Sequence, residues 1–228
     1  MKIAHLYRDL CSPSANPAPQ GIFFDAMGTL FGLRRSVGDC YGEVAQQFGV
    51  TVDGEVLTQA FFQAFRAAPP LAFGETDLER LSRLEFQWWR SLVMDCFERV
   101  GVLQEFEDFE GYFTALYGYF MGPEPWFVYE DVIPTLNYWQ GRGVKLGVIS
   151  NFDSRLLRIL EALQLRDYFP EILISSRCAV AKPQPSIFHQ ALSLYQLQPA
   201  QTWHIGDSQR EDYEGAIAAG LTAFWIER

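Results

Sequence analysis

The run GIFFDAMGTLF, residues 21–31, is the feature around which the rest of the chain can be interpreted. Its apolar residues end abruptly in Asp25, and a glycine and a threonine follow shortly afterwards. This pattern is typical of a buried parallel strand that delivers one charged residue to the carboxyl edge of a sheet. A single Asp after an apolar run is more often a turn former or a helix cap than a nucleophile, so Asp25 needs partners elsewhere.

Later segments of the chain supply such partners. The run at 144–151 closes on a hydroxyl and an amide, the run at 202–208 closes on Gly-Asp-Ser, and an Ala-Lys-Pro stretch lies between them. In chain order, the residues that these segments present are Asp25, Ser150 with Asn151, Lys182, and Asp207 with Asp212. Any one of these segments is a weak signal. Four of them in this order, across residues 21–215, form a strong one.

The composition limits the class of protein. A chain of 228 residues can carry one large domain, or a core with a small accessory domain. Its hydrophobic content of 49% indicates a globular protein. The net charge of -10 argues against a nucleic-acid partner or an anionic membrane surface, because the electrostatic contribution would be repulsive.

The cysteines and the N-terminal residues indicate the cellular compartment of the protein. The four cysteines, Cys11, Cys40, Cys96 and Cys178, are far apart and form no CxxC pair. They are interpreted as reduced thiols of a cytoplasmic protein. No apolar run reaches the roughly 20 residues of a membrane span, and residues 1–20 lack the apolar region of a signal peptide. We expect residues 1–20 to be an irregular extension.

Alternating strands and helices are expected over the second half of the chain. The predicted strands lie near 144–150, 171–175, 202–206 and 222–226, and the predicted helices near 131–141, 154–164, 185–195 and 210–219. Such alternation indicates a parallel sheet with helices on both faces, which the strand at 21–25 joins. The predicted fold is therefore α/β, with a five-stranded core formed by residues 21–32 and 124–228.

Residues 33–123 are predicted to be a helical insert after the first strand. Residues 31–38 are glycine-punctuated and favour a hinge or flap, with a first helix near 42–48. Apolar residues then recur at helical spacing, which predicts a bundle of about four helices. The three predicted apolar faces are Leu57, Ala60, Phe61, Ala64 and Phe65; Leu81, Leu84, Trp88, Leu92 and Cys96; and Phe106, Phe109, Phe113, Leu116 and Phe120.

The four ordered segments resemble the motifs of the haloacid dehalogenase-like hydrolase superfamily. The resemblance implies a Rossmann-like core with a helical cap, in which the first and fourth core strands lie side by side. Asp25, Asp207 and Asp212 would then form one cluster. Neighbouring carboxylates repel one another unless a cation lies between them, and oxygen ligands favour Mg²⁺. The alternative is that Asp207 and Asp212 merely cap the helix that begins near Ser208.

The same resemblance gives roles to the other residues. Asp25 would attack phosphorus and form an aspartyl-phosphate, which water hydrolyses. Lys182, one of only three lysines in the chain, would balance the carboxylates, although it could also be a solvated loop lysine. The Ser150 hydroxyl and the Asn151 backbone amide would bind phosphate oxygens, or alternatively cap the following helix. The cap-entry residues Arg34 and Arg35 would bind an anionic group of the substrate, or be ordinary surface arginines.

Met27 departs from the pattern of the superfamily's phosphatases, which have a second Asp two residues after the nucleophile. A thioether cannot transfer the proton that this Asp transfers, although the Met27 backbone carbonyl could still bind Mg²⁺. Haloacid dehalogenases share the non-acidic position but lack the Gly-Asp-Ser start, so Asp207 argues against them. Phosphonoacetaldehyde hydrolases need a cap lysine, which the insert lacks, and sugar phosphomutases need the missing acid.

The most similar branch is that of haloacid dehalogenase-like hydrolase domain-containing protein 3. It shares the non-acidic position and has stretches similar to 33–38, 150–153 and 182–188. The sequence thus predicts a magnesium-dependent hydrolase of a small phosphorylated metabolite, with slow turnover. The alternatives are a metal-independent 2-haloacid dehalogenase and a catalytically weak binding protein that uses the same pocket.

Overall fold

The computed structural model describes residues 18–228 and divides them into two compact units. Unit 1 comprises the described residues up to Gly32, Ala72–Glu75 and Val128–Arg228, and unit 2 comprises Leu33–Leu71 and Thr76–Phe127. Most of the predicted extension at 1–20 lies outside the described residues. Ala72–Glu75 belongs to unit 1, although it falls within the range that the sequence assigns to the insert.

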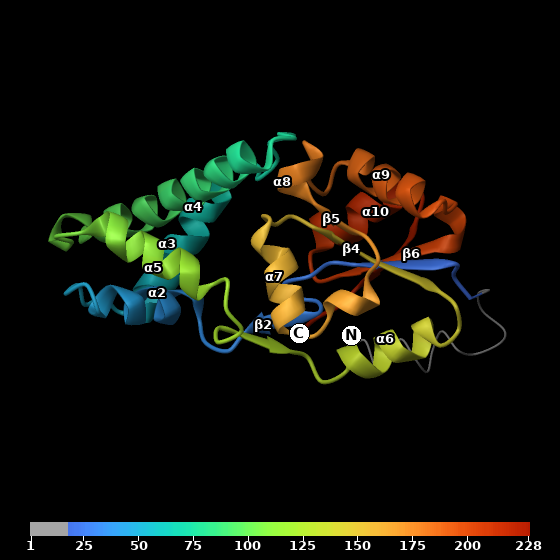
Figure 1. Ribbon diagram of the computed structural model, residues 1–228, viewed down its shortest axis with the longest axis horizontal. Coiled ribbons are helices and arrows are strands. Elements are labelled where there is room, and N and C mark those ends of the chain that lie inside the picture. Colours follow the sequence, from blue (N-terminus) through green and yellow to red (C-terminus); the bar gives the residue numbers. More distant parts are fainter. Residues whose placement is uncertain (1–17) are drawn as a thin grey trace. The chain divides into compact units, whose positions relative to one another are not determined.

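Unit 1 is built on a five-stranded parallel sheet, so the predicted fold class is confirmed. The strand order is β5-β4-β1-β6-β7. The strands are β1 (Gly21–Phe24), β4 (Lys145–Ser150), β5 (Ile172–Ile174), β6 (Thr202–Gly206) and β7 (Thr222–Trp225). Helix α6 (Val132–Gln140) lies on one side of the sheet, and α9 (Pro185–Tyr195) and α10 (Gly215–Ala218) lie on the other (Figure 1). The central strand β1 is buried along its whole length, which explains its uninterrupted apolar sequence.

The helices of unit 1 alternate with its strands as predicted. They are α6 (Val132–Gln140), α7 (Arg155–Ala162), α8 (Ser175–Cys178), α9 (Pro185–Tyr195) and α10 (Gly215–Ala218), with short 3-10 turns at Arg166–Tyr168 and Pro199–Gln201. The single helix predicted over 210–219 is wrong. A π-helical turn, Gln209–Glu214, precedes α10, because the amides of Asp212 and Tyr213 both donate to the Ser208 carbonyl.

Unit 2 contains the predicted four helices. They are α2 (Val37–Gln46), α3 (Gly54–Ala67), α4 (Leu78–Val100) and α5 (Phe109–Tyr119), with a 3-10 turn at Leu103–Glu105. Each helix is capped by a side chain that accepts a backbone N–H, and these caps are Ser36, Asp53, Asp77 and Asp108. The helices enclose a core that includes Phe97, Tyr112 and Phe113. Phe65 and Leu84, predicted on apolar faces, are instead exposed by 43% and 37%.

A second, two-stranded sheet was not predicted. It pairs β2 (Phe31–Leu33) with β3 (Trp126–Val128). The prediction of a hinge over residues 31–38 is therefore wrong at both of its ends, because β2 occupies the first three residues and α2 begins at Val37. Strands of three residues are too short to show an alternating pattern.

None of the helices within residues 18–228 combines the length and the apolar character that a bilayer crossing requires.

Candidate active site

The carboxyl ends of two adjacent strands bring Asp25 and Asp207 together. Asp25 follows β1 and Asp207 follows β6, and the register of these strands pairs Phe24 with Ile205. The Asp25 amide donates to the Ile205 carbonyl at 2.9 Å, which extends this pairing. Asp212 completes the group, since each of the three carboxylates offers one oxygen and these oxygens lie within 4.8 Å of one another. Asp25 and Asp212 are buried, whereas Asp207 is exposed.

Lys182 lies between two of these carboxylates. Its Nζ donates to Asp25 Oδ1 at 2.7 Å and to Asp212 Oδ1 at 2.5 Å. The residue is only 4% exposed, so the alternative of a solvated loop lysine is wrong. Three carboxylates and one ammonium group leave two negative charges uncompensated.

Burial and the neighbouring charges shift the protonation equilibria of these carboxylates. Burial raises the pKa of Asp25 to about 7, Lys182 opposes that rise, and Asp212 and Asp207 add to it. Burial also acts to raise the pKa of Asp212, but Lys182 and His204 outweigh it and hold that pKa well below its usual range. Partial desolvation of its carboxylate and the charge of Asp212 raise the pKa of Asp207. A cation at the cluster would therefore stabilise the ionised carboxylates.

Asp212 is turned inward, and Ser208 caps the helical turn. The Ser208 Oγ accepts the Glu211 amide at 3.1 Å, and the Ser208 amide donates to Asp212 Oδ2 at 3.0 Å. Gly206 permits this approach, because a Cβ at that position would lie 2.2 Å from Asp212 Cγ. The alternative that Asp207 and Asp212 serve only as helix caps is therefore wrong, because Ser208 is the cap and both carboxylates lie in the cluster with Asp25.

The end of β4 supports Asp25 and Lys182 differently from what was expected. Ser150 Oγ donates to Asp25 Oδ1 over a long 3.4 Å. The Asn151 side chain pairs with the Lys182 backbone in both directions, donating to its carbonyl at 2.9 Å and accepting its amide at 2.8 Å. Asn151 therefore positions the loop that carries Lys182. The alternative that this pair caps α7 is wrong, since Ser154 occupies the N-cap position.

The turn after Asp25 packs directly against Asp207. Thr29 Oγ1 donates to Asp207 Oδ1 at 3.4 Å. Gly28 has a φ of +85°, and a Cβ there would lie 2.4 Å from Asp207 Oδ2. Met27 forms an isolated bridge with Phe31, and the residue is 38% exposed. Met27 is thus an accessible residue of this turn, and its thioether supplies no proton donor.

Sequence reasoning missed the roles of His204 and Glu211. The His204 ring is fully buried, and its Nε2 lies 2.9 Å from Asp212 Oδ1. Burial lowers the pKa of His204, and Asp212 opposes that shift. Glu211 Oε2 accepts the Asn151 Nδ2–H at 3.0 Å. A histidine inside an apolar strand is the signal that could have been followed, because a buried imidazole requires a polar partner.

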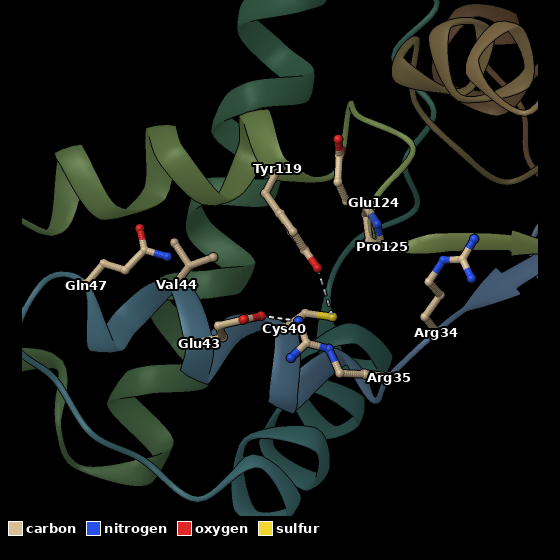
Figure 2. Close-up of a pocket in the computed structure, with 9 residues that line it drawn as sticks. All are labelled: Arg34, Arg35, Cys40, Glu43, Val44, Gln47, Tyr119, Glu124 and Pro125. Carbon is tan, nitrogen blue, oxygen red and sulfur yellow. Dashed lines mark hydrogen bonds and ion pairs between the residues drawn. The ribbon is translucent and has the colours of Figure 1, made fainter.

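Arg34 and Arg35 belong to unit 2 and line a cavity there of about 500 Å³ (Figure 2). Figure 2 shows Arg35 turned toward Glu43, with which it forms an ion pair, and Tyr119 pointing toward the Cys40 thiol. The other lining residues are Val44, Gln47, Glu124 and Pro125. These arginines thus lie in a different unit from the Asp25 cluster.

The acidic cluster fits a hard divalent cation. Its donors are three carboxylates, two of which are buried, and oxygen donors of this kind suit Mg²⁺. The predicted ligand set of Asp25, Asp207 and Asp212 is therefore assembled in unit 1, and Met27 lies on the adjoining turn.

Known proteins are similar to this chain in sequence and in fold. The family described as haloacid dehalogenase-like hydrolase matches residues 19–220. Haloacid dehalogenase-like hydrolase domain-containing protein 3 of Bos taurus is 39% identical over 203 residues, which cover 89% of this chain and 80% of that protein.

Solved structures confirm the fold at low sequence identity. A dehalogenase gives a TM-score of 0.68 at 20% identity, covering 94% of this chain and 87% of that one. A phosphatase of the same superfamily from Thermococcus onnurineus gives a TM-score of 0.61 at 22% identity, and the match covers 91% of this chain and 86% of that one. The Bacillus subtilis hydrolase YfnB, solved with magnesium bound, gives a TM-score of 0.66 at 17% identity. That match covers 92% of this chain and 89% of the other.

The fold and its acidic site define an enzyme with a Rossmann-like parallel sheet and a carboxylate cluster at the carboxyl ends of its strands. The chain belongs to the haloacid dehalogenase-like hydrolase family. The predicted resemblance, including its branch, is confirmed by these matches.

Proposed function

We propose that this protein is a magnesium-dependent hydrolase of a small phosphorylated metabolite, with Asp25 as its nucleophile. The observation that carries the proposal is the meeting of Asp25, Asp207, Asp212 and Lys182 at the carboxyl ends of adjacent strands. In open parallel sheets this edge is where ligands bind. The phosphatase and the magnesium-bound hydrolase among the structural neighbours are consistent with this chemistry.

The side chains divide the reaction between them. An Asp25 oxygen attacks phosphorus, the bond to the leaving oxygen breaks, and the resulting aspartyl-phosphate is hydrolysed by water, which regenerates the carboxylate. Lys182 Nζ, already hydrogen-bonded to Asp25, orients that carboxylate and offers positive charge to the phosphoryl oxygens. When bound to Asp25, Asp207, Asp212 and the Met27 carbonyl, Mg²⁺ would supply further electrostatic stabilisation. The Ser150 hydroxyl and the Asn151 backbone amide bind phosphate oxygens.

Proton transfer to the leaving group is the slow step of this mechanism. Met27 occupies the place from which an acid would act, and its thioether has no proton to give. The leaving oxygen therefore takes its proton from water, so that turnover is slow relative to phosphate binding.

A small panel of phosphate esters tests the proposal. We expect turnover that requires Mg²⁺ and is abolished by Asp25→Asn. Metal-independent release of halide from a 2-haloacid would instead identify a dehalogenase, an alternative that the non-acidic Met27 favours. Binding of phosphate without turnover in the presence of Mg²⁺ would identify a binding protein. Either of those results overturns the proposal.

The buried thiols of Cys40 and Cys96 support a cytoplasmic location as part of the proposal, since reduced thiols are typical of that compartment. We also propose that the partner is a small molecule and neither nucleic acid nor a membrane, in keeping with the net charge of -10.

A further inference from the structure

His204 is a buried titratable group that the proposed mechanism does not use. It lies in β6 and is fully buried, and its ring is nearly perpendicular to that of Phe188 at a centroid distance of 5.1 Å. The surrounding layer is apolar and includes Phe23, Ile149 and Ala216. A polar ring in such a place costs free energy unless its nitrogen atoms are hydrogen-bonded.

Only one of the two ring nitrogens has a partner. Nε2 lies 2.9 Å from Asp212 Oδ1, whereas Nδ1 is buried without a hydrogen-bond partner among the described residues. Asp212 Oδ1 also accepts from Lys182, so this oxygen is an acceptor and the hydrogen must reside on Nε2. A second proton on Nδ1 would bury an unpaired N–H. The geometry therefore requires a hydrogen on Nε2, which the ring donates to Asp212.

An apolar residue at position 204 would fill the same space without stranding Nδ1. The contact with Asp212 is thus what the imidazole adds. We propose that His204 is a positioning residue whose Nε2–H orients Asp212, so that this carboxylate holds Lys182 against Asp25. The inference rests on the proposed function only where it predicts a change in turnover.

Three donors fix the orientation of the Asp212 carboxylate. His204 and Lys182 share Oδ1, and the Ser208 amide binds Oδ2. Without the imidazole, only the flexible Lys182 side chain would hold Oδ1. Both the carboxylate and the ammonium group would then gain freedom, and the site would be less well organised for Mg²⁺.

The tautomer can be measured directly. The chain has three histidines, so ¹⁵N-detected NMR of the metal-free full-length protein can resolve the ring nitrogens of His204, assigned by comparison with His204→Leu. We expect a protonated Nε2 at pH 7.5. An Nε2 that carries no proton would overturn the proposal.

Two substitutions separate positioning from packing. His204→Gln can place an amide N–H near the position of Nε2, whereas His204→Leu removes the donor. We expect the leucine variant to bind Mg²⁺ about tenfold more weakly in calorimetry and to lose a similar factor in kcat with a smaller change in KM. The glutamine variant should recover most of this loss. Phe188→Leu, which alters the packing of the ring and leaves the donor in place, is the matched control.

Equal Mg²⁺ affinities in the glutamine and leucine variants would overturn the proposal, as would a loss in Phe188→Leu as large as that in His204→Leu. Thermal unfolding of each variant identifies any that fails to fold, and the wild-type tautomer is still decisive in that case. If the wild-type protein hydrolyses no phosphate ester, the proposed function fails, but the NMR and Mg²⁺ measurements still decide the role of His204.

Discussion

In the proposed mechanism, Met27 limits the chemistry that the candidate active site can perform. Its side chain is accessible and lies two residues after the proposed nucleophile, at the position of the acid in the superfamily's phosphatases. We expect Met27→Asp to raise kcat for phosphate-ester hydrolysis by about tenfold or more, because general acid catalysis typically contributes a factor of about 10² to 10⁴. Steady-state kinetics at saturating Mg²⁺ measures this change.

Met27→Leu is the control, and it should leave kcat unchanged because neither side chain transfers a proton. An aspartate variant no faster than wild type would show that another group already supplies the proton.

Asp25 makes the stability of the metal-free protein dependent on pH. Its folded-state pKa of about 7 lies above the ordinary value of 3.8, so the folded protein holds this proton more tightly than the unfolded chain. Its contribution to stability is present below the lower value and is lost as the pH rises through the higher one. Urea unfolding in EDTA should therefore show a steeper loss of stability for wild type than for Asp25→Asn between about pH 4 and 7. Parallel curves for the two proteins would contradict the raised pKa.

Arg34 and Arg35 carry the prediction that a cationic residue of unit 2 binds an anionic part of the substrate. If so, Arg34→Ala or Arg35→Ala should raise KM severalfold and change kcat little, since ground-state binding is lost. Arg99→Ala is the matched control, because Arg99 is also a half-exposed arginine of unit 2 paired with a carboxylate. An effect on thermal stability alone would leave these residues as surface arginines.

The connection between β6 and the π-helical turn fixes the geometry of the acidic cluster. Gly206 ends β6, and Asp212 approaches it so closely that a Cβ would overlap the carboxylate. We expect Gly206→Ala to displace Asp212 and to weaken Mg²⁺ binding at least about tenfold, as measured by calorimetry. Gly118→Ala in α5 is the control, since a Cβ there meets no atom within 4 Å. Unchanged affinity in the Gly206 variant would show that Asp212 does not contribute to the site.

Regular elements were predictable where a local pattern specifies them. The bounds of β6 and α9 agree with the prediction, because one is an apolar run ending in Gly-Asp and the other begins with a proline in its first turn. The sheet β2-β3 and the π-helical turn were missed. Three residues carry no periodicity, and the π register depends on where the Ser208 carbonyl finds its donors.

The residues of the candidate active site were likewise predictable only in part. The order of the motifs identified Asp25, Lys182, Asp207 and Asp212, and the structure brings all four together. The sequence assigned no role to His204, because its partner Asp212 is reached only through the turn that follows β6. Contacts that depend on such local geometry have no signature in residue spacing.

The two units have separate hydrophobic cores, and this separation predicts how core substitutions act. Phe97 is fully buried in the core of unit 2. We expect Phe97→Ala to destabilise that unit by about 3–5 kcal/mol, as measured by urea unfolding. The acidic cluster lies in unit 1, so Mg²⁺ affinity should stay unchanged under conditions where the variant is folded. A parallel loss of affinity would mean that the two units fold as one cooperative block.

The strand β1 lies between β4 and β6, which follow it by more than a hundred residues in the chain. As the polypeptide emerges from the ribosome, β1 therefore has no strand to pair with until residue 145 and later residues have been made. The helices of unit 2 contact neighbours close in sequence and can form before that point, since local contacts form fastest. In a nascent chain, the helical bundle of unit 2 should thus form first, and the sheet around Asp25 should form last.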